Sequence, residues 1–208
     1  MKAYIFSIGE RTTNICARLM REYNFEPIVL DGKESSFEKY KRFINDAYAT
    51  GEDVLKIDAD IIPNKYIRGV YAESVGYQLQ DALMIQYQNY CIYRNGINIG
   101  NPVFYRKKAI AIIKGNLDKL DPTRPEATAW RLPQINDWTH TSDLIVGLHG
   151  LYQRDEDIDR HEANKIDRKQ IDGYDFKIVR ELTDLLPCLG CSRDGGDHDG
   201  ECMIKAKA

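Results

Sequence analysis

Long apolar runs are missing from this chain of 208 residues. No stretch approaches the roughly 20 apolar residues that a membrane-spanning helix requires. The apolar part of the first segment, Met1 to Ser7, is too short for the core of a signal peptide, and Gly9-Glu10-Arg11 follows at once. We therefore expect a protein with no membrane span and a cytoplasmic location.

A strong excess of charge of either sign is also missing. The net charge is −3, with 43% hydrophobic and 29% charged residues. This balance gives no overall electrostatic reason for tight nucleic-acid binding, and it is typical of a folded protein rather than a disordered one. The length suits one sizeable domain with an appendage. We predict a domain over residues 1–180 and a short tail over residues 181–208.

Phosphate-binding glycine motifs are absent as well. No Gly-x-x-x-x-Gly-Lys loop occurs, which excludes a P-loop protein. No internal repeat is present either. The functional prediction must therefore come from other residues.

The first 60 residues alternate between strand and helix patterns. The predicted strands cover residues 3–8, 27–30 and 54–58; one helix is expected from Thr12 or Thr13 to about Tyr23, and another from Ser35 or Ser36 to Gly51. This alternation predicts right-handed crossovers and a parallel sheet flanked by helices. Ligands of such sheets bind at the carboxyl ends of the strands, so the loops after Ser7, Asp31 and Asp58 are expected to meet.

The later part of the chain is less regular. We expect a helix over 64–80, strand structure over 82–93 and 100–105, a helix over 106–114, an irregular loop region over 118–138, a strand over 144–148 and a charged helix over 151–170. Cys16 and Cys91 lie in periodic apolar segments and are expected to be core thiols.

Two aspartates end the most informative stretch, the apolar run from Val54 to Asp60. Residues i and i+2 of a strand share a face, so Asp58 and Asp60 can converge on one site if the backbone stays extended. Paired carboxylates suit Mg²⁺ or Mn²⁺. Asp-x-Asp also occurs at 155/157, 157/159 and 197/199, but only the pair at 58/60 follows an apolar run that favours a strand.

Residues 1–150 resemble the GT-A class of nucleotide-sugar-dependent glycosyltransferases. Three features carry the resemblance: the strand-helix alternation of the first 60 residues, the passage from Phe43 to Asp60 with its Ala49-Thr50-Gly51-Glu52-Asp53 and Asp58-Ala59-Asp60, and the later Val146-Gly147-Leu148-His149-Gly150. The resemblance implies a GT-A-like α/β fold with a mixed, mostly parallel sheet. It also implies transfer of a sugar from a UDP- or GDP-sugar, with Mn²⁺ or Mg²⁺ as cofactor.

The resemblance assigns roles to individual residues. Asp60 would bind the divalent metal, with His149 as a further ligand, and Asp58 would contact the donor ribose or the metal's water shell. Ser7, Arg11 and Asp31 would approach the nucleotide. Such a metal neutralises the charge that develops on the leaving diphosphate.

The acceptor side is less defined. An inverting enzyme needs a carboxylate base, and Glu126 and Asp137 are candidates because they lie in the region rich in proline and tryptophan. Trp130 and Trp138 are candidates for stacking on a sugar or base, although core packing explains them equally well.

The tail combines three cysteines and a histidine. Cys188, Cys191, His198 and Cys202 have the ligand types and close spacing of a closed zinc site. If zinc binds, the tail is a candidate contact for a macromolecular acceptor. Incidental thiols in a flexible tail remain the alternative.

Two other functions stay open. One is a sugar-phosphate nucleotidyltransferase of related fold, although Ser7-Ile8-Gly9-Glu10-Arg11 has only one glycine where those enzymes have a glycine-rich loop followed by Arg and Lys. The other is a non-catalytic module that binds a nucleotide or nucleic acid, in which the acidic pair is structural. Release of pyrophosphate would identify the first, and absence of metal-dependent nucleotide binding would favour the second.

Overall fold

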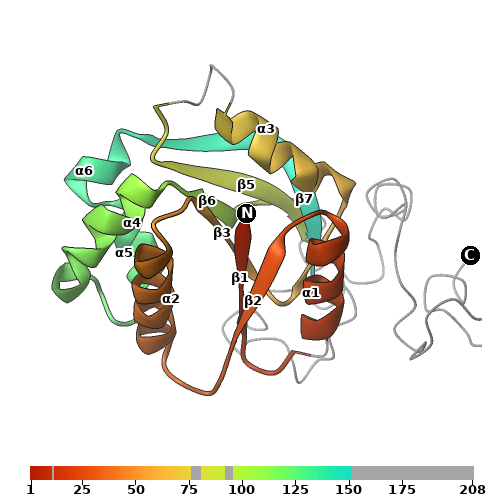
Figure 1. Ribbon diagram of the computed structural model, residues 1–208, viewed down its shortest axis with the longest axis horizontal. Helices are drawn as coiled ribbons and strands as arrows, with labels where there is room; N and C mark the ends of the chain where they lie inside the picture. Colours follow the sequence, from red (N-terminus) through yellow and green to blue (C-terminus); the bar gives the residue numbers. More distant parts are fainter. Residues whose placement is uncertain (11, 76–80, 92–95, 151–208) are drawn as a thin grey trace, which may run out of the picture.

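The computed structural model describes residues 1–10, 12–75, 81–91 and 96–150, which form a mixed sheet with helices on both faces (Figure 1). Its strands are β1 (Lys2–Ser7), β2 (Glu26–Asp31), β3 (Val54–Asp58), β4 (Ile61–Pro63), β5 (Met84–Cys91), β6 (Gly96–Tyr105) and β7 (Thr139–His149). Its helices are α1 (Thr13–Glu22), α2 (Ser36–Thr50), α3 (Gly69–Val75), α4 (Lys107–Lys114), α5 (Pro125–Trp130) and α6 (Pro133–Asn136), with 3₁₀ turns η1 (Lys65–Arg68) and η3 (Leu117–Lys119). The expected α/β class is confirmed.

The strand order is β2-β1-β3-β6-β5-β7-β4. β1 pairs in parallel with β2 and β3, as the alternation of the first 60 residues predicts. β6 then runs antiparallel to β3 and β5, β7 runs parallel to β5, and β4 runs antiparallel to β7. The sheet is therefore parallel at the β2 end and mixed beyond β3.

Alternating side chains of the central strands build a separate core on each face. On β1, Ala3 and Ile5 pack with α1, whereas Tyr4 packs with α2, α4 and α5. This is the period of two that a strand imposes. In Figure 1, α1 and α3 lie on one side of the sheet, and α2, α4, α5 and α6 lie on the other.

Local signals fix the ends of α2. The Ser35 hydroxyl accepts a hydrogen bond from the Glu38 backbone N–H at 3.2 Å, which caps the first turn. Gly51 ends the helix in the left-handed region, with a φ of 65°. Thr12 precedes α1 but does not cap it, because its hydroxyl donates to the Ala59 carbonyl at 2.7 Å. This bond ties the start of α1 to the turn after β3.

The irregular loop expected over 118–138 contains two short helices, so that prediction is wrong. Pro125 and Pro133 each occupy the first turn of a helix, α5 and α6. Proline is accepted there because its missing N–H has no helical partner to lose. Prolines that indicated a loop in the sequence therefore mark helix starts.

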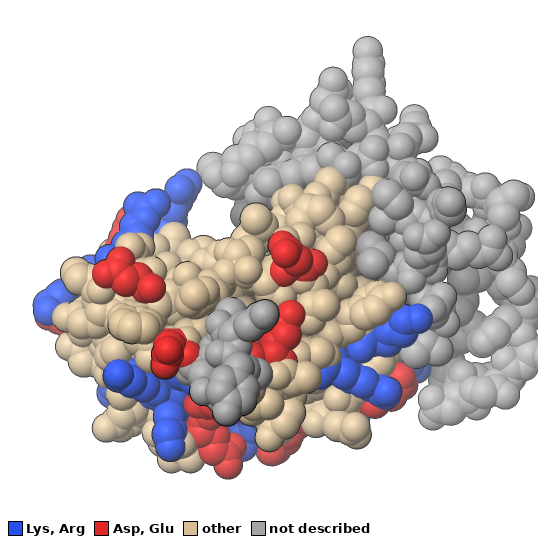
Figure 2. Space-filling model, turned by 90° about the horizontal axis from the view of Figure 1, so that it is seen from above, with Lys and Arg blue, Asp and Glu red and all other residues tan. Residues whose placement is uncertain are grey.

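Some predictions lie outside the described residues: the role of Arg11, the helix over 151–170, the domain boundary at residue 180 and the tail with Cys188, Cys191, His198 and Cys202. Among the described residues, no helix is long and apolar enough to cross a membrane. On the face that Figure 2 shows, described acidic and basic side chains are interspersed among uncharged ones, and acidic groups lie near the middle of the view. The described residues visible on that face form no broad basic patch of the kind that binds nucleic acid.

Candidate functional site

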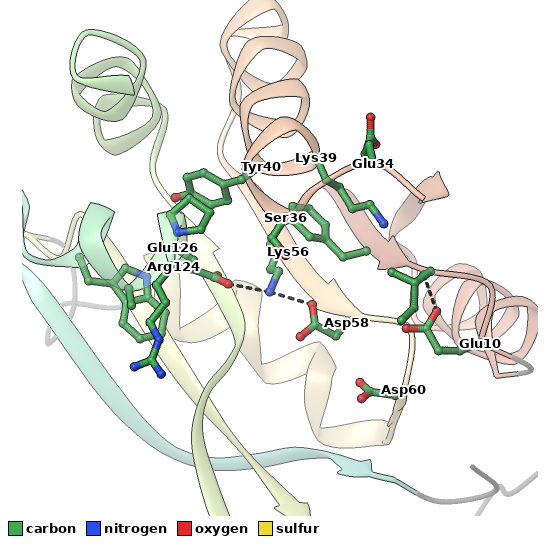
Figure 3. Close-up of a pocket in the computed structure, with 15 residues that line it drawn as sticks. Glu10, Glu34, Ser36, Lys39, Tyr40, Lys56, Asp58, Asp60, Arg124 and Glu126 are labelled. Atoms are coloured by element: carbon green, nitrogen blue, oxygen red, sulfur yellow. Dashed lines mark hydrogen bonds and ion pairs between the residues drawn. The ribbon is translucent and has the colours of Figure 1, made fainter. Parts of the chain in front are cut away.

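A cavity of about 480 Å³ lies beside the carboxyl ends of β1 and β3, with side chains of α2 and α5 in its wall (Figure 3). It is lined by Phe6, Ile8, Glu10, Glu34, Ser36, Lys39, Tyr40, Lys56, Asp58, Asp60, Arg124, Pro125, Glu126, Ala127 and Trp130. Its volume is within the usual range for small-molecule sites. The sheet edge that the sequence predicted for ligand binding therefore does contain a cavity.

Asp58 and Asp60 both line the cavity, but not by the geometry that the sequence argument assumed. The extended backbone ends at Asp58, and Ala59 and Asp60 form a turn. The period of two instead pairs Asp58 with Lys56, whose Nζ lies 2.8 Å from Asp58 Oδ1. The strand thus places Lys56 beside Asp58, and the turn at Ala59 moves Asp60 off the strand face that they share.

Lys56 joins two carboxylates in a buried network. Its side chain is 3% exposed, and Nζ also lies 2.8 Å from Glu126 Oε2 on α5. The hydroxyl of Tyr105 donates to the other Glu126 oxygen at 2.9 Å. Despite burial, which acts in the opposite direction, the two carboxylates raise the pKa of Lys56 above its usual value. Lys56 therefore remains charged and fixes α5 over the end of β3.

Asp58 has a second partner in Asn101 on β6, whose side-chain amide donates to Asp58 Oδ2. The same amide's oxygen accepts from the Asp58 backbone N–H at 3.3 Å. Burial raises the pKa of Asp58 to about 6, with Asp60 and Glu126 adding to the effect and Lys56 opposing it. Both oxygens of Asp58 thus have partners within the protein.

Asp60 and His149 meet although 89 residues separate them in the sequence. Asp60 Oδ2 lies 3.0 Å from His149 Nε2. The pairing follows from the sheet: β4 runs antiparallel to β7 with Ile61 opposite His149, next to Asp60. Burial opposes ionisation of both groups, but their hydrogen bond and opposite charges together outweigh it. They lower the pKa of Asp60 and, with a contribution from Cys91, raise the pKa of His149 to about 10.

The other ring nitrogen of His149 faces Cys91 at the end of β5. Nδ1 lies 3.1 Å from Cys91 Sγ, and Cys91 is fully buried. A second partner of this kind fixes the orientation of a histidine ring and influences which nitrogen carries the proton. Cys91 is a core thiol, as expected, and it also supports His149.

The residues present fit a divalent metal that is completed by a substrate. Carboxylate oxygen from Asp60 and imidazole nitrogen from His149 form a mixed donor set that suits Mn²⁺. In the described part of the chain, no group of three or more His, Cys, Asp or Glu side chains is arranged to hold a metal ion. Metals that carry nucleotides commonly take only one or two protein ligands and the remainder from phosphates and water.

The other predicted residues occupy different positions. Glu126 lines the cavity, whereas Asp137 is exposed after α6 and is not part of the cavity wall. Ser7 is 1% exposed, and its hydroxyl bonds to Glu10 and Thr13, both at 2.9 Å. Asp31 is exposed and accepts a hydrogen bond from the Gly32 N–H. Neither Ser7 nor Asp31 lines the cavity.

Two tryptophans were candidates for stacking, and the structure separates them. Trp130 lines the cavity and packs on Gly100, where an added Cβ would lie 2.8 Å from the indole ring. Trp138 is 47% exposed and does not line it. Trp130 is therefore the indole placed to contact a ligand.

Sequence reasoning missed two buried lysines of the cavity. Lys56 interrupts the apolar run of β3, and Lys39 lies on the same helical stripe as Phe43 and Ala47, which are buried. A lysine at a position where the pattern expects an apolar residue was the available signal. Glu10 was also missed; its carboxylate accepts from the Ile8 N–H at 2.7 Å and shapes the loop after β1.

No protein-family model matches the chain, and no curated protein matches its sequence. The fold is similar to that of a glycosyltransferase involved in the glycosylation of the major capsid of PBCV-1, with a TM-score of 0.51 and 14% identity over 75% of this chain and 96% of that chain. At this identity the likeness establishes the fold alone. The chain therefore has a mixed α/β fold similar to that of this glycosyltransferase.

Other solved structures are similar to a lower degree, and two of these similarities are given for their descriptions alone. One is to A197 from STIV, with a TM-score of 0.42 and 11% identity over 53% of this chain and 66% of that chain. The other is to 4-diphosphocytidyl-2C-methyl-D-erythritol synthase from Anaerococcus prevotii, with a TM-score of 0.44 and 11% identity over 75% of this chain and 91% of that chain.

Proposed function

We propose that this protein is a glycosyltransferase that moves a sugar from a UDP- or GDP-sugar to an acceptor, with Mn²⁺ or Mg²⁺ as cofactor. One observation carries the proposal: Asp60 and His149 come together beside a cavity whose wall also holds Asp58. An oxygen ligand in the wall of a cavity of nucleotide size, with a nitrogen ligand in contact with it, suits a metal-bound diphosphate. The similar fold of a glycosyltransferase agrees with this function.

Asp60 and His149 are the proposed metal ligands, and Asp58 is proposed to face the donor. A bound cation supplies Lewis-acid stabilisation of the negative charge on the departing diphosphate. The ion pair between Asp60 and His149 holds the two groups together before a metal arrives. Loading then requires His149 to release its Nε2 proton, because only the neutral imidazole is a ligand.

Glu126 is the stronger candidate for the base that accepts a proton from the acceptor, because it lines the cavity and Asp137 does not. Lys56 and Tyr105 orient its two oxygens. A carboxylate oxygen has more than one lone pair, so these contacts leave capacity for a proton.

Asp60→Asn and Glu126→Gln test the proposal against a panel of nucleotide sugars, measured as donor hydrolysis with and without Mn²⁺. Asp60→Asn is expected to abolish metal-dependent turnover while the circular dichroism spectrum is retained. Full activity of Asp60→Asn in the presence of EDTA would contradict the assignment. Pyrophosphate release from a nucleoside triphosphate and a sugar phosphate would instead identify a nucleotidyltransferase.

The tail remains a separate proposal. Cys188, Cys191, His198 and Cys202, in residues 181–208, are proposed to bind one zinc ion and to contact a macromolecular acceptor. Soft thiolates select zinc, so this ion should not compete with Mn²⁺ for the oxygen-rich site. Elemental analysis of protein purified without chelator should find about one zinc per chain, in line with one closed four-ligand site, and Cys191→Ser should lose it.

A further inference from the structure

Lys39 is a buried cation in the wall of the cavity. Its side chain descends from α2 on the Glu10 side of the cavity, as Figure 3 shows. The residue is 4% exposed. Nζ donates to the carbonyl of Ser7 at the end of β1 and, at 3.0 Å, to the carbonyl of Gly32 just after β2.

Among the described residues, no carboxylate lies within the 4.0 Å ion-pair distance of Lys39 Nζ. The nearby acids of the wall are used elsewhere: Glu34 lies 2.9 Å from Arg42, and Glu10 accepts from Ser7 and Ile8. An ammonium group has three hydrogens, and two are bound to backbone carbonyls. A buried charge of this kind is costly unless a partner completes it.

The surroundings favour a neutral acceptor over a phosphate. Glu10 lies at the same end of the cavity as Lys39 (Figure 3), and its negative charge disfavours a further anion there. Ile8 also lines the cavity although it is 65% exposed, which leaves an apolar surface for a flat ring. A planar heterocycle with a carbonyl oxygen fits both features: its oxygen can accept the third hydrogen of Lys39 Nζ, and its ring can pack on Ile8.

We infer that Lys39 selects the nucleobase of the donor by donating a hydrogen bond to a ring carbonyl of uracil or guanine. Adenine carries an amino group at the ring position where guanine carries its carbonyl oxygen, and an amino group at that position cannot accept a hydrogen bond from an ammonium. This inference rests on the proposed function, because it assumes that a nucleotide occupies the cavity. It adds a residue that determines specificity and that the donor-binding prediction did not include.

Calorimetric titration of the full chain with UDP, GDP, ADP and inorganic pyrophosphate, each with Mn²⁺, tests the inference. Wild-type protein is expected to bind UDP or GDP at least about tenfold more tightly than ADP, since a base that leaves a buried donor unpaired is rejected. Lys39→Met should lower the affinity for the preferred nucleotide about 10- to 100-fold, the range of one lost charge-assisted hydrogen bond. Its affinities for ADP and pyrophosphate should hardly change.

Two variants keep the test independent of stability. Lys41→Met removes an exposed lysine of the same helix and should preserve the preference between bases. Lys39→Gln keeps two N–H donors for the carbonyls of Ser7 and Gly32 and removes the third. It should lose the preference as Lys39→Met does, even if Lys39→Met folds poorly.

Three results would overturn the inference. Equal affinities of the wild type for UDP, GDP and ADP would remove the base selectivity while leaving the proposed function in place. An equal loss of pyrophosphate binding in Lys39→Gln would place a phosphate at Lys39 instead. Failure of the wild type to bind any nucleoside diphosphate would refute the proposed function and this inference together.

Discussion

Two lysines line the same cavity, and the protein treats their charges differently. Lys56 lies between the carboxylates of Asp58 and Glu126, each 2.8 Å away. Lys39 is buried to a similar degree, but backbone carbonyls are its partners. Lys56 therefore has a structural role, because its ion pairs hold the side chains of Asp58 and Glu126 in place. A lysine without a counter-charge retains its electrostatic attraction for a ligand.

The largest expected effect is loss of stability on removing the neutralised lysine. Lys56→Met leaves two partly buried carboxylates without their cation and should lower the free energy of unfolding by about 3–5 kcal/mol, the usual cost of breaking a buried ion pair. Urea denaturation measures it. The double variant Lys56→Met/Glu126→Gln should recover part of the loss. A decrease below about 1 kcal/mol would mean that Lys56 behaves like a surface ion pair.

The next effect concerns His149, which brings the comparison to the metal site. His149→Ala should weaken Mn²⁺ binding about 10- to 100-fold, as loss of a supporting ligand does at other metal sites. Titration of Mn²⁺ followed by electron paramagnetic resonance measures the affinity. His140→Ala is the matched control, since His140 is exposed on the same strand. An unchanged titration would assign His149 a structural role.

The two aspartates extend the comparison to negative charge. Asp58 has its oxygens engaged by Lys56 and Asn101, whereas Asp60 contacts the candidate ligand His149. Asp60→Asn should therefore reduce Mn²⁺ affinity more than Asp58→Asn does, by about tenfold, the lower range for a loss at a metal shell. Equal losses would show that Asp58 leaves Lys56 to bind the metal directly.

The smallest effect is expected at Lys39 in the absence of ligand. Lys39→Met leaves two backbone carbonyls without a donor but also removes a buried charge, and these terms oppose each other. The free energy of unfolding should fall by about 1 kcal/mol, less than for Lys56→Met. Urea denaturation of both variants in one buffer measures the difference. A decrease in the free energy of unfolding as large as that of Lys56→Met would show that the main role of Lys39 is structural.

The first 60 residues were predictable because their structure is local. Helix caps such as Ser35, the glycine at position 51 and the period of two in β1 are all visible in the sequence. Later strands pair over long distances, and no local signal places β7 between β5 and β4. Pro125 and Pro133 led to the wrong prediction of a loop, because proline is found both in the first turn of a helix and at positions that interrupt one.

Of the charged residues in the cavity wall, the sequence indicated Asp58, Asp60 and Glu126 but neither Glu10 and Glu34 nor the two lysines. Asp58 and Asp60 follow an apolar run, and His149 ends another, so the pattern indicated them. The period of two was applied to Asp58 and Asp60, although the turn at Ala59 makes Lys56 and Asp58 the residues that share a face. Which acid meets which cation depends on strand order and on α5. Those are properties of the folded chain rather than of spacing.

The contact between Trp130 and Gly100 gives the molecule an optical property. The chain has two tryptophans, and only Trp130 lines the cavity. The absence of a side chain at Gly100 lets the indole approach β6 closely, which holds the chromophore in the cavity wall. Trp138→Phe would leave a single tryptophan, whose fluorescence would report occupancy of the cavity. Mn²⁺, a paramagnetic quencher, would dim that emission when it binds beside Asp60, so filling of the cavity could be followed in real time without a label.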